Sequence, residues 1–130
     1  MDAETRDYFD EHFDAVVSQL SPTVHRLLDE VTLYVEDYPS PQVLQQTGAT
    51  RRTLCGLYTG IPITEQRVEF SGVLSDAVYI YREGILQQAI NHRGQINEAK
   101  LREQIRITVL HELGHHHGLD EDDLTELGYG

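Results

Sequence analysis

Apolar residues along the first part of the chain follow two different periods. Over residues 2–20 they recur three or four positions apart, which predicts an amphipathic helix facing the core. Ser21-Pro22 combines a helix N-cap with a proline at the first helical position, and predicts a short helix through about Glu30. Over residues 31–36 apolar and polar side chains alternate, which predicts a strand that ends at the turn residues 38–41.

The middle of the chain is predicted to add short extended segments and one helix. Residues 53–58 and 61–64 have the composition of strands, and the proline in the second segment places it at a sheet edge or in a loop. Residues 78–81 predict a short strand. Residues 84–91 predict a helix, because their apolar side chains recur at helical spacing.

A long helix is predicted towards the end of the sequence. Asn97 is its expected N-cap and His117 its last residue, a length of about 30 Å at ~1.5 Å per residue. Leu124 and Leu127 indicate one more helical turn. The element order predicts a single α+β domain over residues 1–130, with a short mixed sheet backed by helices.

The predicted long helix ends in the letters HELGH at positions 111–115, the HExxH pattern. Positions four apart lie on one helix face, so His111 and His115 can present imidazole nitrogens to one metal ion. Glu112 lies beside the open metal position, where a general base is needed. Gly118 can adopt the positive φ that ends a helix, and the turn would bring an acidic side chain back towards the metal. The spacing therefore predicts a hydrolytic zinc site.

Charge and composition narrow the classes of partner. The net charge is −12 and the arginines are scattered, which argues against a nucleic-acid-binding protein. No apolar stretch reaches the ~20 residues of a membrane helix, and the acidic N-terminal segment lacks the features of a secretory signal. Cys55 is the one cysteine, so an internal disulfide is excluded and a buried, inert thiol is expected. A cytoplasmic protein without a membrane partner is the expectation.

The motif and its surroundings resemble a known family. The letters HELGHHHGLDEDDL, GLYTGIPITEQR, GVLSDAVYIYREGIL and ELGYG are similar to those of the small bacterial zincin-like metallopeptidases, over about residues 51–130. The resemblance implies a zincin-like fold with a short twisted sheet. The motif predicts one zinc per chain, and the leading functional hypothesis expects a peptide or unfolded protein as substrate. The resemblance also implies an edge strand beside the cleft, for which residues 79–82 are the candidate, and to which extended substrates could pair. Metzincins place a methionine turn beneath the metal, whereas the one methionine here is Met1.

The extended motif assigns further roles. Its eleventh position is Glu121, the preferred third zinc ligand, with Asp120 and Asp122 as alternatives one residue away. Tyr79 and Tyr129 are candidate donors to an oxyanion. The remaining histidines are expected to be structural or surface residues: His12, His25, His92, His116 and His117.

Three functions compete on the sequence alone. The first is a zinc metallopeptidase in which Glu112 takes a proton from water and passes it to the leaving amine. The second is a zinc-binding interaction module that has lost catalysis, which the missing methionine and the small size allow. The third is a zinc endoribonuclease with a His-x3-His-x5-His spacing, disfavoured by Glu112 and by the acidic charge. The physiological metal and the oligomeric state are left open by the sequence.

Overall fold

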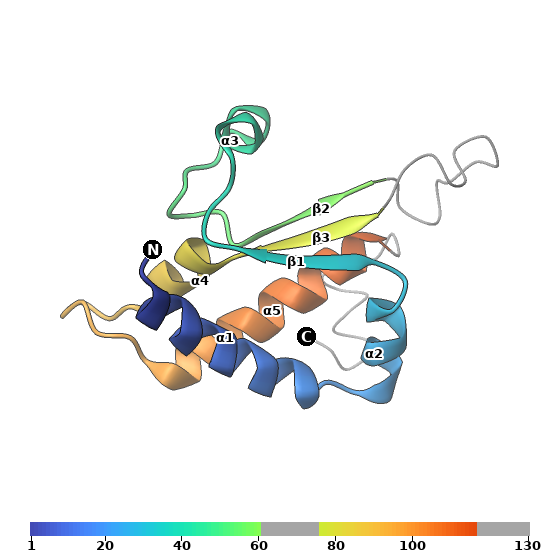
Figure 1. Cartoon of the computed structure of the whole chain (residues 1–130), viewed down its shortest axis with the longest axis horizontal. Coiled ribbons are helices and arrows are strands. Elements are labelled where there is room, and N and C mark those ends of the chain that lie inside the picture. The colour runs from blue at the N-terminus through green and yellow to red at the C-terminus, as the bar shows by residue number, and fades with distance from the viewer. Residues whose placement is uncertain (61–75, 117–130) are drawn as a thin grey trace.

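A computed structural model describes residues 1–60 and 76–116 of the chain (Figure 1). The architecture is α+β, as the sequence predicts. In chain order the described elements are α1 (Ala3–Ser18), α2 (Pro22–Leu28), β1 (Thr32–Glu36), α3 (Pro41–Thr47), β2 (Gly56–Thr59), β3 (Ala77–Tyr81), α4 (Arg82–Ala89) and α5 (Glu98–His116). Within those ranges, no helix has the length and apolar character needed to cross a membrane. The predicted extended segment 61–64 and the helical turn at Leu124 and Leu127 lie outside the described residues.

The sheet has the order β1-β3-β2 and is mixed. β1 runs parallel to β3, with Thr32 opposite Ala77, whereas β2 runs antiparallel to it, with Gly56 opposite Ile80. The expectation that residues 79–82 form an edge strand is therefore wrong. β3 is central, and its side chains are largely buried on both faces of the sheet. Among the described strands, β2 is the edge strand that borders α5.

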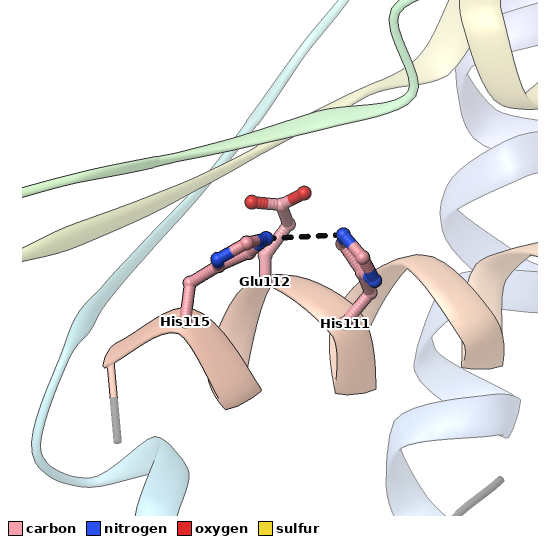
Figure 2. Close-up of side chains that lie close together, drawn as sticks. All are labelled: His111, Glu112 and His115. Atoms are coloured by element: carbon pink, nitrogen blue, oxygen red, sulfur yellow. Dashed lines mark hydrogen bonds between the residues drawn. The ribbon is translucent and has the colours of Figure 1, made fainter. Parts of the chain in front are cut away.

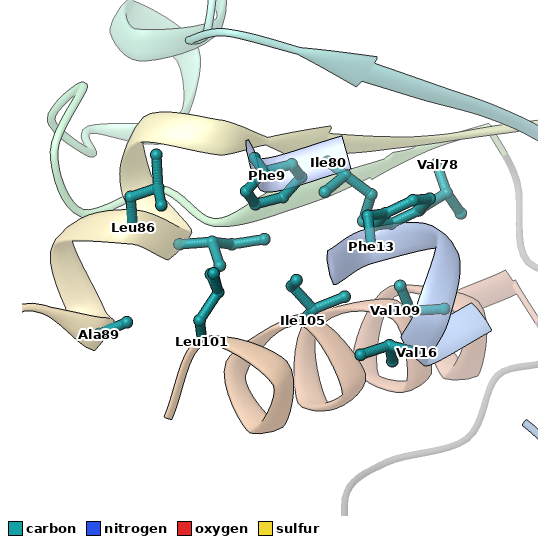
Figure 3. Packing of buried hydrophobic residues seen from close by; sticks show 11 residues of the cluster. Phe9, Phe13, Val16, Val78, Ile80, Leu86, Ala89, Leu101, Ile105 and Val109 are labelled. Carbon is teal, nitrogen blue, oxygen red and sulfur yellow. The ribbon is translucent and has the colours of Figure 1, made fainter. Parts of the chain in front are cut away.

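The main core lies between the sheet and the two long helices, α1 and α5 (Figures 1 and 3). Each of these elements contributes apolar side chains at the period of its own structure. The central members are Phe9, Phe13 and Val16 of α1, Val78 and Ile80 of β3, and Leu101, Ile105 and Val109 of α5. Burying one such side chain stabilises the fold by about 1.5–3 kcal/mol. The buried stripe on α5 fixes the rotation of that helix, and so the directions of the side chains at its other end.

Side-chain caps set where the helices begin. Ser21 accepts a hydrogen bond from the backbone N–H of Val24 at 3.2 Å, and Asn97 accepts one from Lys100 at 3.0 Å. Both caps are those predicted from the sequence. α3 was not predicted, although its Ser40 cap is followed by a proline in the same way as Ser21.

A cluster of four charged side chains, hereafter the Arg82 cluster, joins α1, the turn after β1 and the start of α4. Arg82 is 8% exposed and donates to Asp10 at 2.9 and 3.2 Å and to Asp37 at 2.9 Å. Arg6 donates to the other carboxylate oxygen of Asp37 at 2.7 Å. This hydrogen bond from Arg6 is the main reason why the pKa of Asp37 is lowered. The cluster holds α1 to the sheet through paired charges.

Candidate metal centre

The two histidines of the HExxH motif face each other on the last turns of α5 (Figure 2). Nε2 of His111 lies 3.0 Å from Nε2 of His115, and the two rings are steeply inclined. Together with a carboxylate oxygen of Glu112, these atoms lie within 4.8 Å of one another. Helical periodicity brings the histidines together, because residues four apart share one face. The arrangement is the one that the sequence spacing predicts.

The histidine pair fits a zinc ion. Imidazole nitrogens bind zinc at about 2.0–2.1 Å, so two tetrahedral ligands lie about 3.3 Å apart. The 3.0 Å separation of the Nε2 atoms is a few tenths of an ångström below that spacing, a gap that small ring rotations close. Burial, followed by the nearby His111, lowers the pKa of His115. This ring is therefore held in its neutral form, which is the form that binds a metal.

The Glu112 side chain extends towards the sheet, and its carboxylate lies beside the two facing rings (Figure 2). Its carboxylate accepts a hydrogen bond from the backbone N–H of Tyr58 in β2. Burial raises the pKa of Glu112, against the opposing effects of His111 and of this hydrogen bond. The carboxylate is thus held by the edge strand, in surroundings that favour taking up a proton.

The pairing of β2 with β3 explains why Tyr58 is able to donate. The backbone N–H of Tyr81 donates to the carbonyl of Cys55 at 2.8 Å, and hydrogen-bonded pairs alternate along an antiparallel ladder. Gly56 and Tyr58 therefore direct their N–H and C=O groups away from β3. This is the side on which the carboxylate of Glu112 is bound.

The backbone of β2 lies unusually close to α5 at Gly56. A Cβ atom at this position would lie 2.8 Å from Cγ2 of Thr108 and 3.0 Å from Cγ of Glu112. It would also lie 3.0 Å from the carbonyl oxygen of Tyr79. A glycine inside a strand often marks such a close approach, and this was the signal available in the sequence. Neither Gly56 nor Tyr58 was singled out as part of the site.

A shallow hollow of about 240 Å³ opens beside the motif. Its walls come from the segment before β2 and from the face of α5 that precedes the histidines. The lining residues are Leu54, Cys55, Gly56, Gln104, Ile107, Thr108, His111 and Glu112. Ile107 is 43% exposed, which is unusual for a large apolar side chain. Burial raises the pKa of Cys55, so this partly buried side chain is held as a neutral thiol.

Several residues predicted for the site lie outside the described part of the chain. These are Gly118, Glu121 with its alternatives Asp120 and Asp122, His117, and Tyr129. Tyr79 stacks on Tyr34 with ring centroids 5.1 Å apart. Since strand side chains alternate, it lies on the face opposite Val78 and Ile80, which contact the helices. The structure does not bring Tyr79 to the histidine pair.

Among the described residues, the group of side chains that could hold a metal contains none of the other histidines. His12 is buried in α1, where its Nδ1 accepts a hydrogen bond from Arg102 at 2.9 Å. His25 belongs to α2, and His92 is exposed after α4. His116 is the last residue of α5. The contacts of His12 are those of a structural side chain.

Comparison with known proteins gives the family of the chain. A sequence model of the zincin-like metallopeptidase family matches residues 28–130, which is most of the chain. The protein belongs to this family. The match includes β1 and α3 as well as the motif, and so extends further towards the N-terminus than the resemblance carried by residues 51–130. A search of curated proteins finds no match to the chain.

Proposed function

We propose that the protein is a zinc-dependent metallopeptidase that hydrolyses peptide bonds. The observation that carries this proposal is the convergence of two imidazoles and a carboxylate within 4.8 Å, in a chain of the zincin-like family. His111 and His115 would hold the zinc, and Glu121 would complete the set as third ligand. Two histidines and a carboxylate also suit other divalent ions, so zinc is part of the proposal.

Glu112 acts as the general base and then as the general acid. Bound zinc supplies Lewis acidity, which polarises the scissile carbonyl and makes water easier to deprotonate. Glu112 accepts the proton of the attacking water as the new C–O bond forms. It then gives this proton to the amide nitrogen as the C–N bond breaks, so that the products are a carboxylic acid and an amine, which at neutral pH ionise to a carboxylate and an ammonium group. The raised pKa of Glu112 suits both transfers, because it moves the carboxyl towards neutral pH.

The hollow beside Glu112 supports an extended peptide or an unfolded protein segment as substrate. Leu54 and Ile107 offer apolar surface next to the reacting groups, and the volume of about 240 Å³ accommodates one side chain. For comparison, a cavity of ~150 Å³ binds benzene. An apolar side chain beside the scissile bond would anchor the substrate there.

Metal content is the first test of the proposal. Protein purified without a histidine tag or added metal should contain about one zinc per chain by elemental analysis. His115→Ala should lose this zinc, whereas the matched control His92→Ala, at an exposed histidine outside the motif, should keep it. Metal-free wild-type protein would overturn the zinc assignment.

Peptide cleavage is the second test. A library of unstructured peptides should be cleaved by the zinc-loaded wild-type protein, and cleavage should be lost in Glu112→Gln. Turnover unchanged in this variant would contradict the role of Glu112. Tightly held zinc with no cleavage of any peptide would instead identify a zinc-binding interaction module.

The hollow has its own test. Ile107→Asp should lower kcat/KM most for peptides with a large apolar residue at the cleavage site and leave the zinc content unchanged. Equal losses for peptides with small and large side chains would show that the hollow does not select the substrate.

A further inference from the structure

We propose that Gly56 is a positioning residue for Glu112. The missing side chain at Gly56 lets β2 lie against α5, so that the backbone N–H of Tyr58 reaches the carboxylate of Glu112. The catalytic consequence rests on the proposed function, in which Glu112 is the base. The contact itself does not, and it is measurable without turnover.

Space, and not backbone conformation, is what requires glycine here. Gly56 is not among the residues with positive φ, so its backbone conformation suits any residue. A Cβ atom would instead meet Thr108 at 2.8 Å and Glu112 at 3.0 Å on the helix side. Carbon atoms pack best about 3.5–4.0 Å apart, so an added methyl group must push one of these groups away.

Thr108 has little freedom to move. It is 5% exposed, and its hydroxyl donates to the carbonyl of Gln104 at 2.8 Å while accepting from the Gln104 side-chain amide at 3.3 Å. These bonds fix the rotamer that directs Cγ2 at Gly56. Strain from an added methyl group is therefore passed to the two softer neighbours, the β2 backbone and the side chain of Glu112.

Displacement of either neighbour weakens the same contact. If β2 moves outwards, the N–H of Tyr58 moves away from the carboxylate, and if Cγ of Glu112 moves, the carboxylate leaves the N–H. A general base must stay within hydrogen-bond reach of the proton it takes, and a misplacement of ~1 Å can cost about 100-fold in rate. The histidine pair is less exposed to this change, because both residues belong to one helix.

A double-mutant design separates positioning from simple packing. The variants are Gly56→Ala, Thr108→Ser and their combination, since Thr108→Ser removes Cγ2 and keeps the hydroxyl. Gly56→Ala should lower Tm, lower kcat by about 10-fold or more, and retain zinc. In the combination the closest clash is gone, but the contacts with Cγ of Glu112 and with the carbonyl oxygen of Tyr79, each at 3.0 Å, remain. With Thr108→Ser as the reference, the Tm lost in Gly56→Ala should be partly regained in the combination, whereas the lost kcat should not be regained.

Amide hydrogen exchange of Tyr58, measured by NMR on the full chain, supplies the readout that does not depend on activity. Exchange should be slow in the wild type, faster in Glu112→Ala, and faster in Gly56→Ala with or without Thr108→Ser. A kcat that recovers in the combination while Tyr58 exchange stays fast would overturn the proposal, because activity would then not depend on the contact between Tyr58 and Glu112. Unchanged Tyr58 exchange in Gly56→Ala would overturn it as well. If the wild type cleaves no peptide, the proposed function fails, while the exchange data still decide whether Gly56 holds Glu112 in place.

Discussion

The Arg82 cluster and the metal centre are both polar groups set against the core, but their charges are balanced in opposite ways. Asp37 meets two guanidinium groups, at 2.7 and 2.9 Å, and its pKa is lowered, chiefly by the hydrogen bond from Arg6. Glu112 meets a backbone N–H and an imidazole, and burial raises its pKa. The first cluster favours its charged state in the folded protein as it stands. In the metal centre, a bound cation would stabilise the charged form of Glu112.

This difference separates a site that supports the fold from one suited to chemistry. Paired and hydrogen-bonded charges hold elements of the fold together, and removing one partner lowers the stability of the protein. Burial disfavours the charged form of Glu112, and groups with a pKa shifted in this way gather at functional sites. Under the proposed function, the candidate metal centre would lower the stability of the metal-free protein in return for reactivity.

Replacing Glu112 tests most directly whether the metal centre lowers stability and supports catalysis. Glu112→Gln should lower kcat by about 100- to 10,000-fold, because the proton acceptor is lost. The same variant should raise the Tm of the metal-free protein at pH 7, because an ionised, partly buried carboxylate is replaced by a neutral amide. Steady-state kinetics and thermal unfolding check the two parts. A lowered Tm in the metal-free variant would remove the contrast between the clusters.

Breaking the Arg82 cluster should have the opposite profile. Arg82→Met should lower the free energy of unfolding by about 1.5–3 kcal/mol, because Asp10 and Asp37 lose hydrogen bonds to their shared partner while Asp37 keeps Arg6. Urea denaturation followed by circular dichroism gives the value. Zinc binding per folded chain should be retained, since the histidine pair is formed within α5. A loss below about 1 kcal/mol would place this cluster with ordinary surface ion pairs.

The pH dependence of stability should differ in sign between the clusters. For Asp37, whose folded pKa is lowered, the stabilisation is present above its ordinary pKa of 3.8 and is lost as pH falls through the folded value. For Glu112, whose folded pKa is raised, stability is highest below its ordinary pKa of 4.5 and falls as pH rises through the folded value.

Unfolding of the metal-free protein between pH 3 and 8 measures both effects. Asp37→Asn should reduce the loss of stability in acid, and Glu112→Gln should reduce the loss as pH rises above 4.5. Parallel curves for wild type and variants would contradict the assigned shifts.

The smallest effect is expected at an exposed ion pair. Arg51 lies 2.8 Å from Glu83 and over the ring of Tyr38, and its side chain is 54% exposed. Arg51→Ala should cost at most about 1 kcal/mol, because solvent screens such pairs. Measured beside Arg82→Met, it shows how much of the larger loss comes from burial. A cost equal to that of Arg82→Met would show that burial does not distinguish the two arginines.

Local chemistry was predictable from the sequence, whereas the arrangement of strands was not. The caps at Ser21 and Asn97 and the shared face of His111 and His115 depend on residues three or four apart, and the structure agrees with each. The family and the α+β class also agree with the prediction. The omission of α3 was avoidable, because Ser40 carries the same signal as Ser21.

The prediction of an edge strand at residues 79–82 failed because the periodicity of a sequence indicates which side chains are buried. It does not indicate which strands lie next to each other. Residues 78–81 were correctly placed in a strand, but their apolar character did not show that β1 and β2 flank it. The contact of Glu112 with Tyr58 depends on that order, so sequence spacing could not supply it. Gly56 carried a signal, yet the sequence does not say which element approaches a glycine in a strand. Glu121 as third ligand lies outside the described residues and stays a prediction.

The proposed ligand pair and base of the metal centre depend on different amounts of folded structure. His111 and His115 meet within one helix, so a partly unfolded chain that keeps the end of α5 helical could still capture zinc. The placement of Glu112 depends on β2 being docked on β3, a contact between distant parts of the chain. Under mild denaturation, hydrolysis should therefore disappear before metal occupancy does. Zinc content alone would therefore overstate the fraction of active molecules in a preparation. Protection of the Tyr58 amide from hydrogen exchange would be the more accurate measure of that fraction.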